Sequence, residues 1–543
     1  MRGTASPPLA CAGDDLELRQ YFGRRLAALD RLRAGPCATW RELAEIFAPQ
    51  RGRFAAGGAS VPHREASGTS RPIDNTPLLA ARTLASGMMA GISSPARPWF
   101  RLQAAESALN ERPELRAWLE TVQKRLLQVF ARSNLYNCLH TLYGELAIFG
   151  TAALWVDEDE EDVVRGYALT AGEYWLASSR RLAVDTLYRT MWWSARQIVD
   201  TFGLEAVSAA VRHSHDQGRF DDEFEIVHAV EPDPAGRGDD SRGLGFAWRS
   251  AWFERGGSMD RPLLRRGGYA EFPCMAPRWE VCGTGTWGTG PGWVALGDAQ
   301  QLQFQQDRKL EAIDKLVRPP LVGPPTLQNA GSALLPGTVT YLADPSGQGL
   351  RPAFDVRLDL THLMTDIAET QQRIRGAFYA DLFLMMAESD RQDARAPVTA
   401  REVDERREEK MLMLGPVLER LHDELLDPLI RRVFAIMVRN GLVPDPPCTM
   451  GSSGGMPAPL QIEFISLLAS AQKAAATGAL ERFWRFGQAI AQLKPEAIDR
   501  LDADGTLDAY ADLTGVPHAA LVPAAVAAER RIRRANQSPE VDR

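Results

Sequence analysis

Apolar residues recur at helical spacing over much of this chain, and the pattern predicts a mainly helical protein. Near the N-terminus, a stripe over residues 18–32 stops at Gly35-Pro36. A capping-box pattern at Thr39 and Glu42 then opens a second, shorter helix. Three more helices are expected at 78–92, 113–131 and 134–149.

From residue 151 the pattern changes. β-Branched and aromatic residues cluster in short runs between turn signals over 151–193, and again over 224–230 and 248–279. Such runs are typical of antiparallel strands. The acidic stretch 157–162 separates two of them and is best explained as a solvated hairpin turn. The chain is therefore expected to have an α+β fold, mainly helical.

Two long amphipathic helices follow the strands, at 298–318 and 361–387. A Pro- and Gly-punctuated segment, 319–360, joins them. Its first part, 319–343, is an uncharged run of membrane-spanning length, but five prolines exclude a stable lipid-exposed helix. Because an exposed apolar segment usually marks a partner, we expect intersubunit contacts and no membrane.

The longest apolar stripe lies at 399–440, after a polar stretch at 387–398. Pro416 and Pro428 fall inside this stripe. Each proline removes a backbone donor and clashes one turn back, which predicts kinks or a break. The remainder is expected to be a linker at 446–459, a mainly helical region at 460–530 and a polar tail at 531–543.

Composition narrows the function. The 543 residues, 45% of them apolar, can bury a large core and form several domains. A net charge of −8 does not resemble the basic surface that grips duplex DNA. Six scattered cysteines without a CxxC spacing suit a reducing cytoplasm.

Motifs for nucleotide chemistry are weak. Residues 283–288 fit Gly-x-Gly-x-x-Gly, but the Gly-Pro-Gly at 290–292 intervenes where a dinucleotide fold would open a helix. The sequence contains no Gly-Lys-Ser or Gly-Lys-Thr, so a Walker A loop is absent and a packaging ATPase is not expected. The Gly-x-Ser-x-Gly at 451–455 lies in a Pro/Gly linker.

Metal chemistry has little support. His213, His215 and His228, or the acidic stretch 157–162, could in principle gather around an ion, but neither set has a recognised ligand spacing. A surface helix and a hairpin turn are the interpretations we favour, and no metal or cofactor is expected. The tryptophans are assigned to packing, among them Trp192, Trp193, Trp279 and Trp287.

Several further motifs follow one another along the chain. They are Trp-Arg-Glu-Leu-Ala at 40–44, Asp-Asn-Thr-Pro at 74–77, Ser-Pro-Ala-Arg-Pro-Trp-Phe-Arg-Leu at 94–102, Phe-Gly-Thr-Ala at 149–152, Trp-Gly-Thr-Gly-Pro at 287–291, Arg-Ile-Arg-Gly-Ala-Phe at 373–378, Thr-Ala-Arg-Glu-Val at 399–403, Leu-Gly-Pro-Val-Leu-Glu-Arg-Leu at 414–421 and Glu-Leu-Leu-Asp-Pro-Leu-Ile at 424–430. Taken in this order, the motifs resemble the head-to-tail connecting (portal) protein family of T7-like podophages. The residue before Asp298 departs from the family pattern, since it is Gly297.

The resemblance implies a subunit of a twelve-membered ring in the virion, at a capsid vertex, assembled in the host cytoplasm. Double-stranded DNA would pass through its channel during packaging and ejection, without sequence readout. The partners it implies are the large terminase, a tail adaptor protein, and the major capsid and scaffolding proteins. The implied regions are a wing (1–297), a first stem helix (298–318), a clip (319–360), a second stem helix (361–387), a channel loop (388–398), a long wing helix (399–445), a linker (446–459), a crown (460–530) and a tail (531–543).

Four basic residues are the candidates for transient contact with DNA phosphates. They are Arg391 and Arg395 in the expected channel loop, and Lys309 and Lys315 on the first stem helix. Solvated surface positions are an equally good explanation for the two arginines. The candidates for partner-facing residues of the clip are Pro319, Pro320, Leu321, Pro324, Leu334, Leu335 and Tyr341.

Two other functions stay open. One is a phage-encoded hydrolase that uses the serine motif at 451–455 or the histidine group. The other is a different structural head-tail protein, such as a tail adaptor or scaffold. A monomer or dimer with a formed pocket would favour the hydrolase, whereas the length of the chain and the two paired long helices argue against the adaptor or scaffold.

Overall fold

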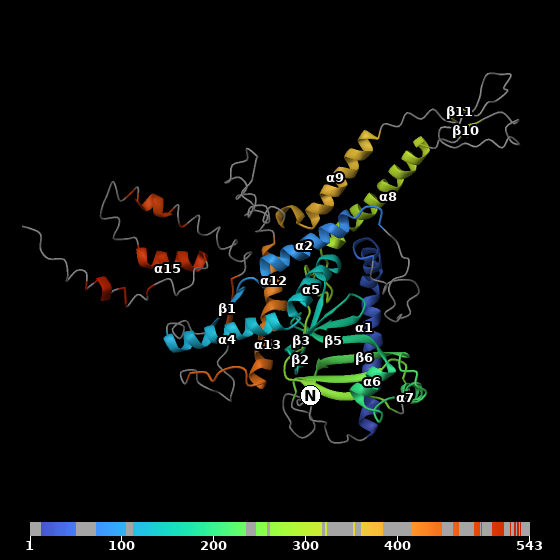
Figure 1. Ribbon diagram of the computed structural model, residues 1–543, viewed down its shortest axis with the longest axis horizontal. Coiled ribbons are helices and arrows are strands. Elements are labelled where there is room, and N and C mark those ends of the chain that lie inside the picture. Colours follow the sequence, from blue (N-terminus) through green and yellow to red (C-terminus); the bar gives the residue numbers. More distant parts are fainter. Residues whose placement is uncertain are drawn as a thin grey trace, which may run out of the picture.

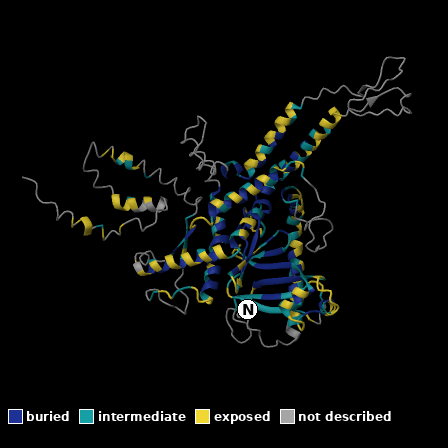
Figure 2. Cartoon of the chain, in the orientation of Figure 1, coloured by how far each residue is buried: buried dark blue, intermediate teal, exposed yellow. Residues whose placement is uncertain are grey.

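Two helices project together from a body of sheets and helices in this computed structural model (Figure 1). They are α8 (Pro291–Val317) and α9 (Thr361–Ala377), and the short strands β10 (Leu321–Val322) and β11 (Arg351–Pro352) pair beyond their ends. Buried residues concentrate in the body, and exposed residues line the projecting helices (Figure 2). The structure describes residues 12–49, 72–104, 112–234, 246–257, 261–317, 321–322, 351–352, 360–383, 414–447 and 460–465, with shorter stretches between 480 and 533.

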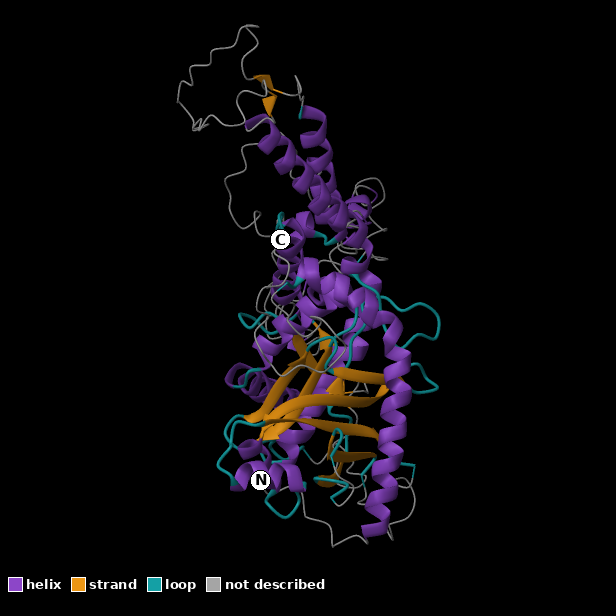
Figure 3. Ribbon diagram, turned by 90° about the vertical axis from the view of Figure 1, so that its right-hand side faces the viewer, coloured by secondary structure: helices purple, strands orange, loops and turns teal. Residues whose placement is uncertain are grey.

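The N-terminal helix corrects one prediction. The expected break at Gly35-Pro36 is wrong, because α1 (Ala12–Phe47) is a single helix of 36 residues with Pro36 inside it. It runs alongside the sheet (Figure 3). One end buries Phe22 against the sheet and the other buries Trp40 in the helical core. Packing at both ends holds the helix together across a residue that local propensity disfavours.

The larger sheet has five antiparallel strands in the order β4-β5-β6-β7-β8. Successive side chains along a strand point to opposite faces of the sheet, and here both faces are covered. In β5, Tyr188 packs under α1, whereas the neighbouring Leu187 faces the smaller sheet. The strands are β4 (Tyr174–Ser178), β5 (Val184–Ser194), β6 (Glu223–Pro232), β7 (Trp248–Glu254) and β8 (Arg265–Tyr269).

The smaller sheet has the order β3-β2-β9. The strands β2 (Ala153–Asp159) and β3 (Val163–Leu169) form a hairpin with its turn at 160–162. The prediction of a hairpin turn for 157–162 is confirmed for the second half of that stretch, whereas 157–159 belong to the end of β2. The third strand is β9 (Cys274–Met275). Two short helices, α6 (Ala195–Phe202) and α7 (Ala209–Asp216), connect β5 to β6.

The helical core confirms the three other N-terminal helices. They are α2 (Thr76–Ile92), α4 (Pro113–Arg132) and α5 (Leu135–Phe149), and Gly150 ends α5 at a positive φ of 77°. In addition, β1 (Phe100–Ala104) pairs with β12 (Leu460–Phe464). The region expected to be mainly helical from 460 thus begins as a strand of the body; a helix, α15 (Ala503–Thr514), follows later.

The segment expected to form a long helix at 399–445 is described from Leu414 onward and is irregular, as its prolines predict. The helix α12 (Gly415–Leu421) has Pro416 in its first turn. A π-helical turn, η3 (His422–Leu426), then leads into α13 (Asp427–Arg439), whose first turn holds Pro428. Each proline therefore occupies a first-turn position, where its missing donor is not needed. Residues 399–413 lie outside the described part of the chain.

The projecting helices differ from their expected bounds. The first begins at Pro291 and not at residue 298, so the Gly-Pro-Gly at 290–292 opens the helix. The second is regular only to Ala377; Tyr379 follows with a positive φ of 52°. Proline is favoured at the first position of a helix, which Pro291 occupies. The helix starts close against α5, because a Cβ at Gly292 would come within 2.3 Å of the carbonyl oxygen of Ile148.

Candidate functional site

The α8–α9 hairpin projects from the body (Figure 1), and much of its surface is not packed against the rest of the chain. The two helices pack side by side near the body, where Leu302, Ile367 and Ile374 are buried. Polar pairs cross between them: Arg373 Nε donates to Asp298 Oδ1 at 3.0 Å, and Gln305 Nε2 donates to Asp366 Oδ2. These pairs define the antiparallel register of the hairpin.

Away from this contact much of the hairpin is exposed (Figure 2), and several of its exposed side chains are apolar. Burying such side chains against another surface is favourable, whereas leaving them in water gains nothing. The hairpin thus has the character of a surface completed by another molecule. The exposed apolar residues, between 39% and 75% accessible, are Val294, Phe304, Leu310, Ile313, Leu316 and Val317 on α8 and Met364 on α9.

A carboxylate at the base anchors the hairpin. Asp74 Oδ2 accepts hydrogen bonds of 2.8 Å from Gln306 of α8 and Gln371 of α9, and Asp74 Oδ1 accepts one from the Thr76 amide. Partial burial alone would raise the pKa of Asp74, but the donors on Thr76, Gln371 and Gln306 together hold it below its usual value.

Gln303 extends this anchor along the backbone. Its Oε1 accepts from the amides of Ile73, at 2.8 Å, and Asp74, at 3.0 Å, and its Nε2 donates to the Asp74 carbonyl. We call Asp74 with Gln303, Gln306 and Gln371 the Asp74 clasp. It joins the segment before α2 to both projecting helices. The Asp-Asn-Thr-Pro motif at 74–77 drew attention to Asp74, but the sequence pattern did not indicate that three glutamine side chains would bind there.

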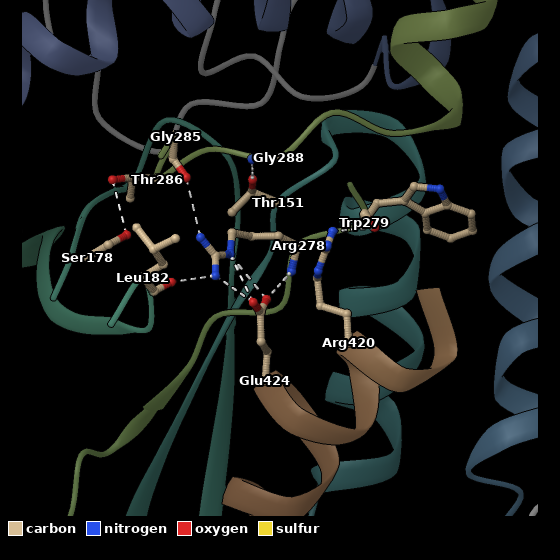
Figure 4. Close-up of polar contacts among 10 residues, drawn as sticks. All are labelled: Thr151, Ser178, Leu182, Arg278, Trp279, Gly285, Thr286, Gly288, Arg420 and Glu424. Carbon is tan, nitrogen blue, oxygen red and sulfur yellow. Dashed lines mark hydrogen bonds and ion pairs between the residues drawn. The ribbon is translucent and has the colours of Figure 1, made fainter. Parts of the chain in front are cut away.

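A second polar centre joins the sheets to the π-helical turn (Figure 4). Arg278 binds the carboxylate of Glu424 through its guanidinium and its own amide, which donates to Oε2 at 2.9 Å. The same guanidinium donates to the Leu182 carbonyl at 2.9 Å and to the Gly285 carbonyl at 3.4 Å. We call these contacts the Arg278 clasp.

The Arg278 clasp lies beside the segment that leads into α8. Gly285 belongs to the Gly-rich segment that leads to Pro291, and the Gly288 amide donates to Thr151 Oγ1 at 2.7 Å (Figure 4). Arg420 of α12 adds a bond to the Trp279 carbonyl at 3.2 Å. Segments far apart in sequence meet here, which is why sequence patterns did not predict the site.

Only part of the predicted site falls within the described residues. Lys315 is exposed, and its Nζ binds Glu311 Oε1 at 2.7 Å; Lys309 is half-buried. At 3.6 residues per turn the two lysines lie about 120° apart around α8, so the helix does not bring them onto one line. Leu321 is in β10. The residues outside the described part are Arg391, Arg395, Pro319, Pro320, Pro324, Leu334, Leu335 and Tyr341.

The histidine group is not assembled as a metal site. His213 and His215 lie on α7, whereas His228 is fully buried in β6, where it accepts from Arg189 Nε at 3.2 Å and contacts Ser250 Oγ at 2.8 Å. Among the residues that the structure describes, no three His, Cys, Asp or Glu side chains are grouped to hold an ion. Within the same residues, no helix is long and apolar enough to cross a bilayer.

Comparison with known proteins identifies relatives over almost the whole chain. The model of the family described as bacteriophage head to tail connecting protein matches residues 19–522. The probable portal protein of Bordetella phage BPP-1 is 42% identical over 92% of this chain and 88% of its own length. The portal protein of Salmonella phage epsilon15 is 41% identical over the same shares of the two chains.

Solved structures give a weaker likeness. A chain from the neck of an empty GTA particle has a TM-score of 0.33 and 13% identity, covering 79% of this chain and 95% of that one. A chain from the virion of a native gene transfer agent particle has a TM-score of 0.34 and 12% identity, covering 86% and 99%.

Proposed function

We infer that this chain, which belongs to the bacteriophage head to tail connecting protein family, is a portal protein. The family match covers residues 19–522. The two phage relatives, a probable portal protein and a portal protein, each align with 92% of this chain. A portal protein is a structural component of the virion and resides at a capsid vertex, where head and tail meet. The chain is therefore a head-tail connector subunit.

Copies of the chain assemble into a ring, and we expect twelve. The observation that carries this proposal is the exposed, partly apolar α8–α9 hairpin. Closed rotational symmetry covers such a surface on every copy and leaves a hole on the axis. Because the body and the Asp74 clasp flank one side of the hairpin, the opposite side, with Asp298, Asp366 and Arg373, faces that hole.

The regions of the ring follow from this arrangement. The sheets and α1 to α5 form the wing, α8 and α9 form the stem, and 319–360 forms the clip at its end. The channel loop at 388–398 and the crown, expected at 460–530 but without the strand β12 that pairs in the body, complete the subunit. The projecting position of α8 and α9 and the placement of β10 and β11 beyond them support the stem and clip (Figure 1).

Double-stranded DNA passes through this channel without sequence readout. A net charge of −8 per chain, and an almost balanced set of charges on α8 and α9, suit a conduit that does not hold phosphates. Lys309 and Lys315, with Arg391 and Arg395, stay our candidates for transient phosphate contact. The large terminase and then a tail adaptor dock on the clip, and capsid and scaffolding proteins surround the wing.

The role is structural and not enzymatic. The position of His228 supports this, because Arg189 and Ser250 take up both of its ring nitrogens inside the sheet. A hydrolase would need that imidazole at an open pocket. The serine motif at 451–455 lies outside the described residues.

Electron microscopy of the purified full-length chain tests the proposal. A ring of twelve copies of this 59.8 kDa chain has a mass of about 720 kDa and shows a central opening in end-on views. Light scattering coupled to gel filtration gives the mass independently. A monomer or dimer at every protein and salt concentration tried, with no annular particles, would overturn the proposal.

A further inference from the structure

We propose that a cavity bordered by α1, α2 and α5 is a docking site for an acidic peptide segment of another protein, which inserts one large apolar side chain. None of the residues that line this cavity belongs to the α8–α9 hairpin. The inference therefore concerns a surface that the proposed ring and channel leave unassigned.

The cavity has a volume of about 270 Å³ and lies where the end of α1 meets two helices that pack on each other. Its apolar walls are Phe47 of α1, Leu78 of α2 and Ile148 of α5. Small residues between these walls leave the space open, since a Cβ added to Gly144 would lie 4.0 Å from the Cβ of Ala85. The recess is therefore a consequence of how α2 and α5 pack.

The size of the cavity indicates what it can hold. Pockets that enclose a drug-sized ligand measure about 300 to 1,000 Å³, so this one suits a single large side chain better than a cofactor. Ordered water is a poor occupant, because a buried water needs several polar partners. The hydroxyl of Thr141, which lines the cavity, donates to the Asn137 carbonyl of its own helix at 3.2 Å. Burial of an apolar side chain there is therefore favourable.

The rim of the cavity is basic. Arg82 of α2 and His140 of α5 line it, and both are exposed. No aspartate or glutamate is among the lining residues. Within the described part of the chain, Arg82 has no carboxylate partner, and His140 Nε2 lies 3.4 Å from the hydroxyl of Ser86. A carboxylate next to the anchoring side chain would accept charge-assisted hydrogen bonds from this rim.

The sequence between two of the bordering helices favours the same partner. Residues 50–71, which join α1 to α2, contain four arginines and one glutamate, whereas the whole chain has a net charge of −8. Nucleic acid is also attracted by basic residues, but its phosphates carry no apolar group that would fill the recess. An acidic peptide with an apolar anchor matches both the rim and the recess.

Few residues should carry such a contact. A side chain that fills a pocket supplies most of the binding energy of a small interface, whereas charges at the rim mainly guide and orient the partner. Leu79, which follows Leu78 and is 57% exposed, extends the apolar surface beyond the cavity. The anchor is therefore expected to be aromatic or a long aliphatic side chain, with acidic residues directly before and after it.

Fluorescence anisotropy with labelled pentapeptides tests the site on the full-length chain. The probes have the sequence Asp-Glu-x-Glu-Asp, where x is Phe, Trp, Leu or Ala. A neutral series has Asn and Gln in place of the acidic residues. We expect the Phe, Trp or Leu peptide to bind, with affinities at least about tenfold lower for the Ala peptide and for the neutral series.

Three variants locate the contact. Gly144→Leu fills the recess and should abolish binding, while the chain still folds, because apart from chain neighbours and the helix backbone the added Cβ meets no atom closer than 4.0 Å. Arg82→Gln should lower the affinity about tenfold. Arg31→Gln on α1 is the matched control and should bind as the parent chain does. Arg31 is exposed, donates to the Ala27 carbonyl of its own helix and does not line the cavity.

Several results would overturn the proposal. Equal binding by Gly144→Leu and the parent chain would place the peptide elsewhere, and equal affinity for the Phe and Ala peptides would reduce the contact to surface charge. Displacement of the peptide by a duplex oligonucleotide would assign the rim to nucleic acid. Binding by the isolated subunit but not by the ring would mean that a neighbouring copy covers the cavity. Failure of every peptide to bind would also overturn the proposal. Each of these results leaves ring formation, and hence the proposed function, unaffected.

Discussion

Arg278 and Glu424 form a nearly buried ion pair that joins the two halves of the subunit, with their side chains 5% and 20% exposed. Arg278 follows the smaller sheet and leads toward α8, whereas Glu424 lies in the π-helical turn between α12 and α13. A π-helical turn presents its side chains one residue out of the α-helical register. From this turn, Glu424 accepts hydrogen bonds from both the guanidinium and the backbone amide of Arg278.

Breaking this pair should destabilise the subunit strongly. Replacing Arg278 with Met leaves the Glu424 carboxylate without its cation in a mostly buried site, and we expect a loss of about 3 kcal/mol in the free energy of unfolding. Urea denaturation followed by tryptophan fluorescence measures it. Arg431→Met is the matched control, because Arg431 forms a more exposed pair with Asp427, four residues before it on the same helix. This substitution should change the free energy of unfolding by less than about 0.5 kcal/mol. Equal effects of the two variants would contradict the role of the Arg278 clasp.

The Asp74 clasp should determine how firmly the hairpin is attached. In Asp74→Asn the single amide oxygen can replace Oδ2 and keep Gln306 and Gln371, but the Thr76 amide then faces the side-chain NH2 in place of Oδ1; in the flipped orientation both glutamines lose their acceptor. We expect a loss of about 1 to 2 kcal/mol and faster amide hydrogen exchange confined to the start of α2 and the facing part of α8. Unchanged exchange in those two segments would show that the clasp is dispensable.

Burial of His228 predicts a dependence of stability on pH. Burial first, and then the positive charges of Arg189 and Arg265, keep the pKa of His228 well below the ordinary value of 6.5. In the folded chain the ring stays neutral, whereas in the unfolded chain it takes up a proton below about pH 6.5. The full contribution of this group is therefore present above that pH and is lost progressively as the pH falls.

The size of this effect is up to about 1.4 kcal/mol for each pH unit below 6.5. Thermal unfolding of the parent chain and of His228→Gln, compared at pH 7.5 and pH 5.5, isolates the share of this histidine. The variant should be less stable at pH 7.5, because it loses the stacking on Trp252, but it should lose less stability on acidification. A parallel fall for both proteins would assign the acid sensitivity to other groups.

Close packing at the start of α8 should make Gly292 intolerant of a side chain. A Cβ there would stand 2.3 Å from the Ile148 carbonyl oxygen, so Gly292→Ala must push α8 away from α5, at a cost of at least about 2 kcal/mol. Gly297→Ala in α8 is the contrasting variant, since apart from its chain neighbours and the helix backbone no atom lies within 4 Å of its Cβ position. It should stabilise the chain by about 0.5 to 1 kcal/mol. Thermal melts of the two variants should shift in opposite directions.

Local signals in the sequence predicted much of the fold. The helical stripes of α2, α4 and α5 and the alternation of the β2–β3 hairpin were recognisable because their buried faces repeat with the period of one element. Pro416 and Pro428 likewise predicted an irregular helix from backbone chemistry alone. The strand β12 was missed, although Leu460, Ile462 and Phe464 alternate, because its partner β1 lies more than 350 residues away.

The sequence by itself determined the class of the fold, the order of its elements and, through the motifs from Trp40 to Asp427, the family. Tertiary structure decided what those elements do together. Only packing at both ends keeps α1 continuous through Pro36, and only folding brings Asp74 to Gln371 and Arg278 to Glu424. The physical reason is that helical and strand periods are local properties of the chain, whereas burial and pairing of charges depend on residues that become neighbours only in the folded protein.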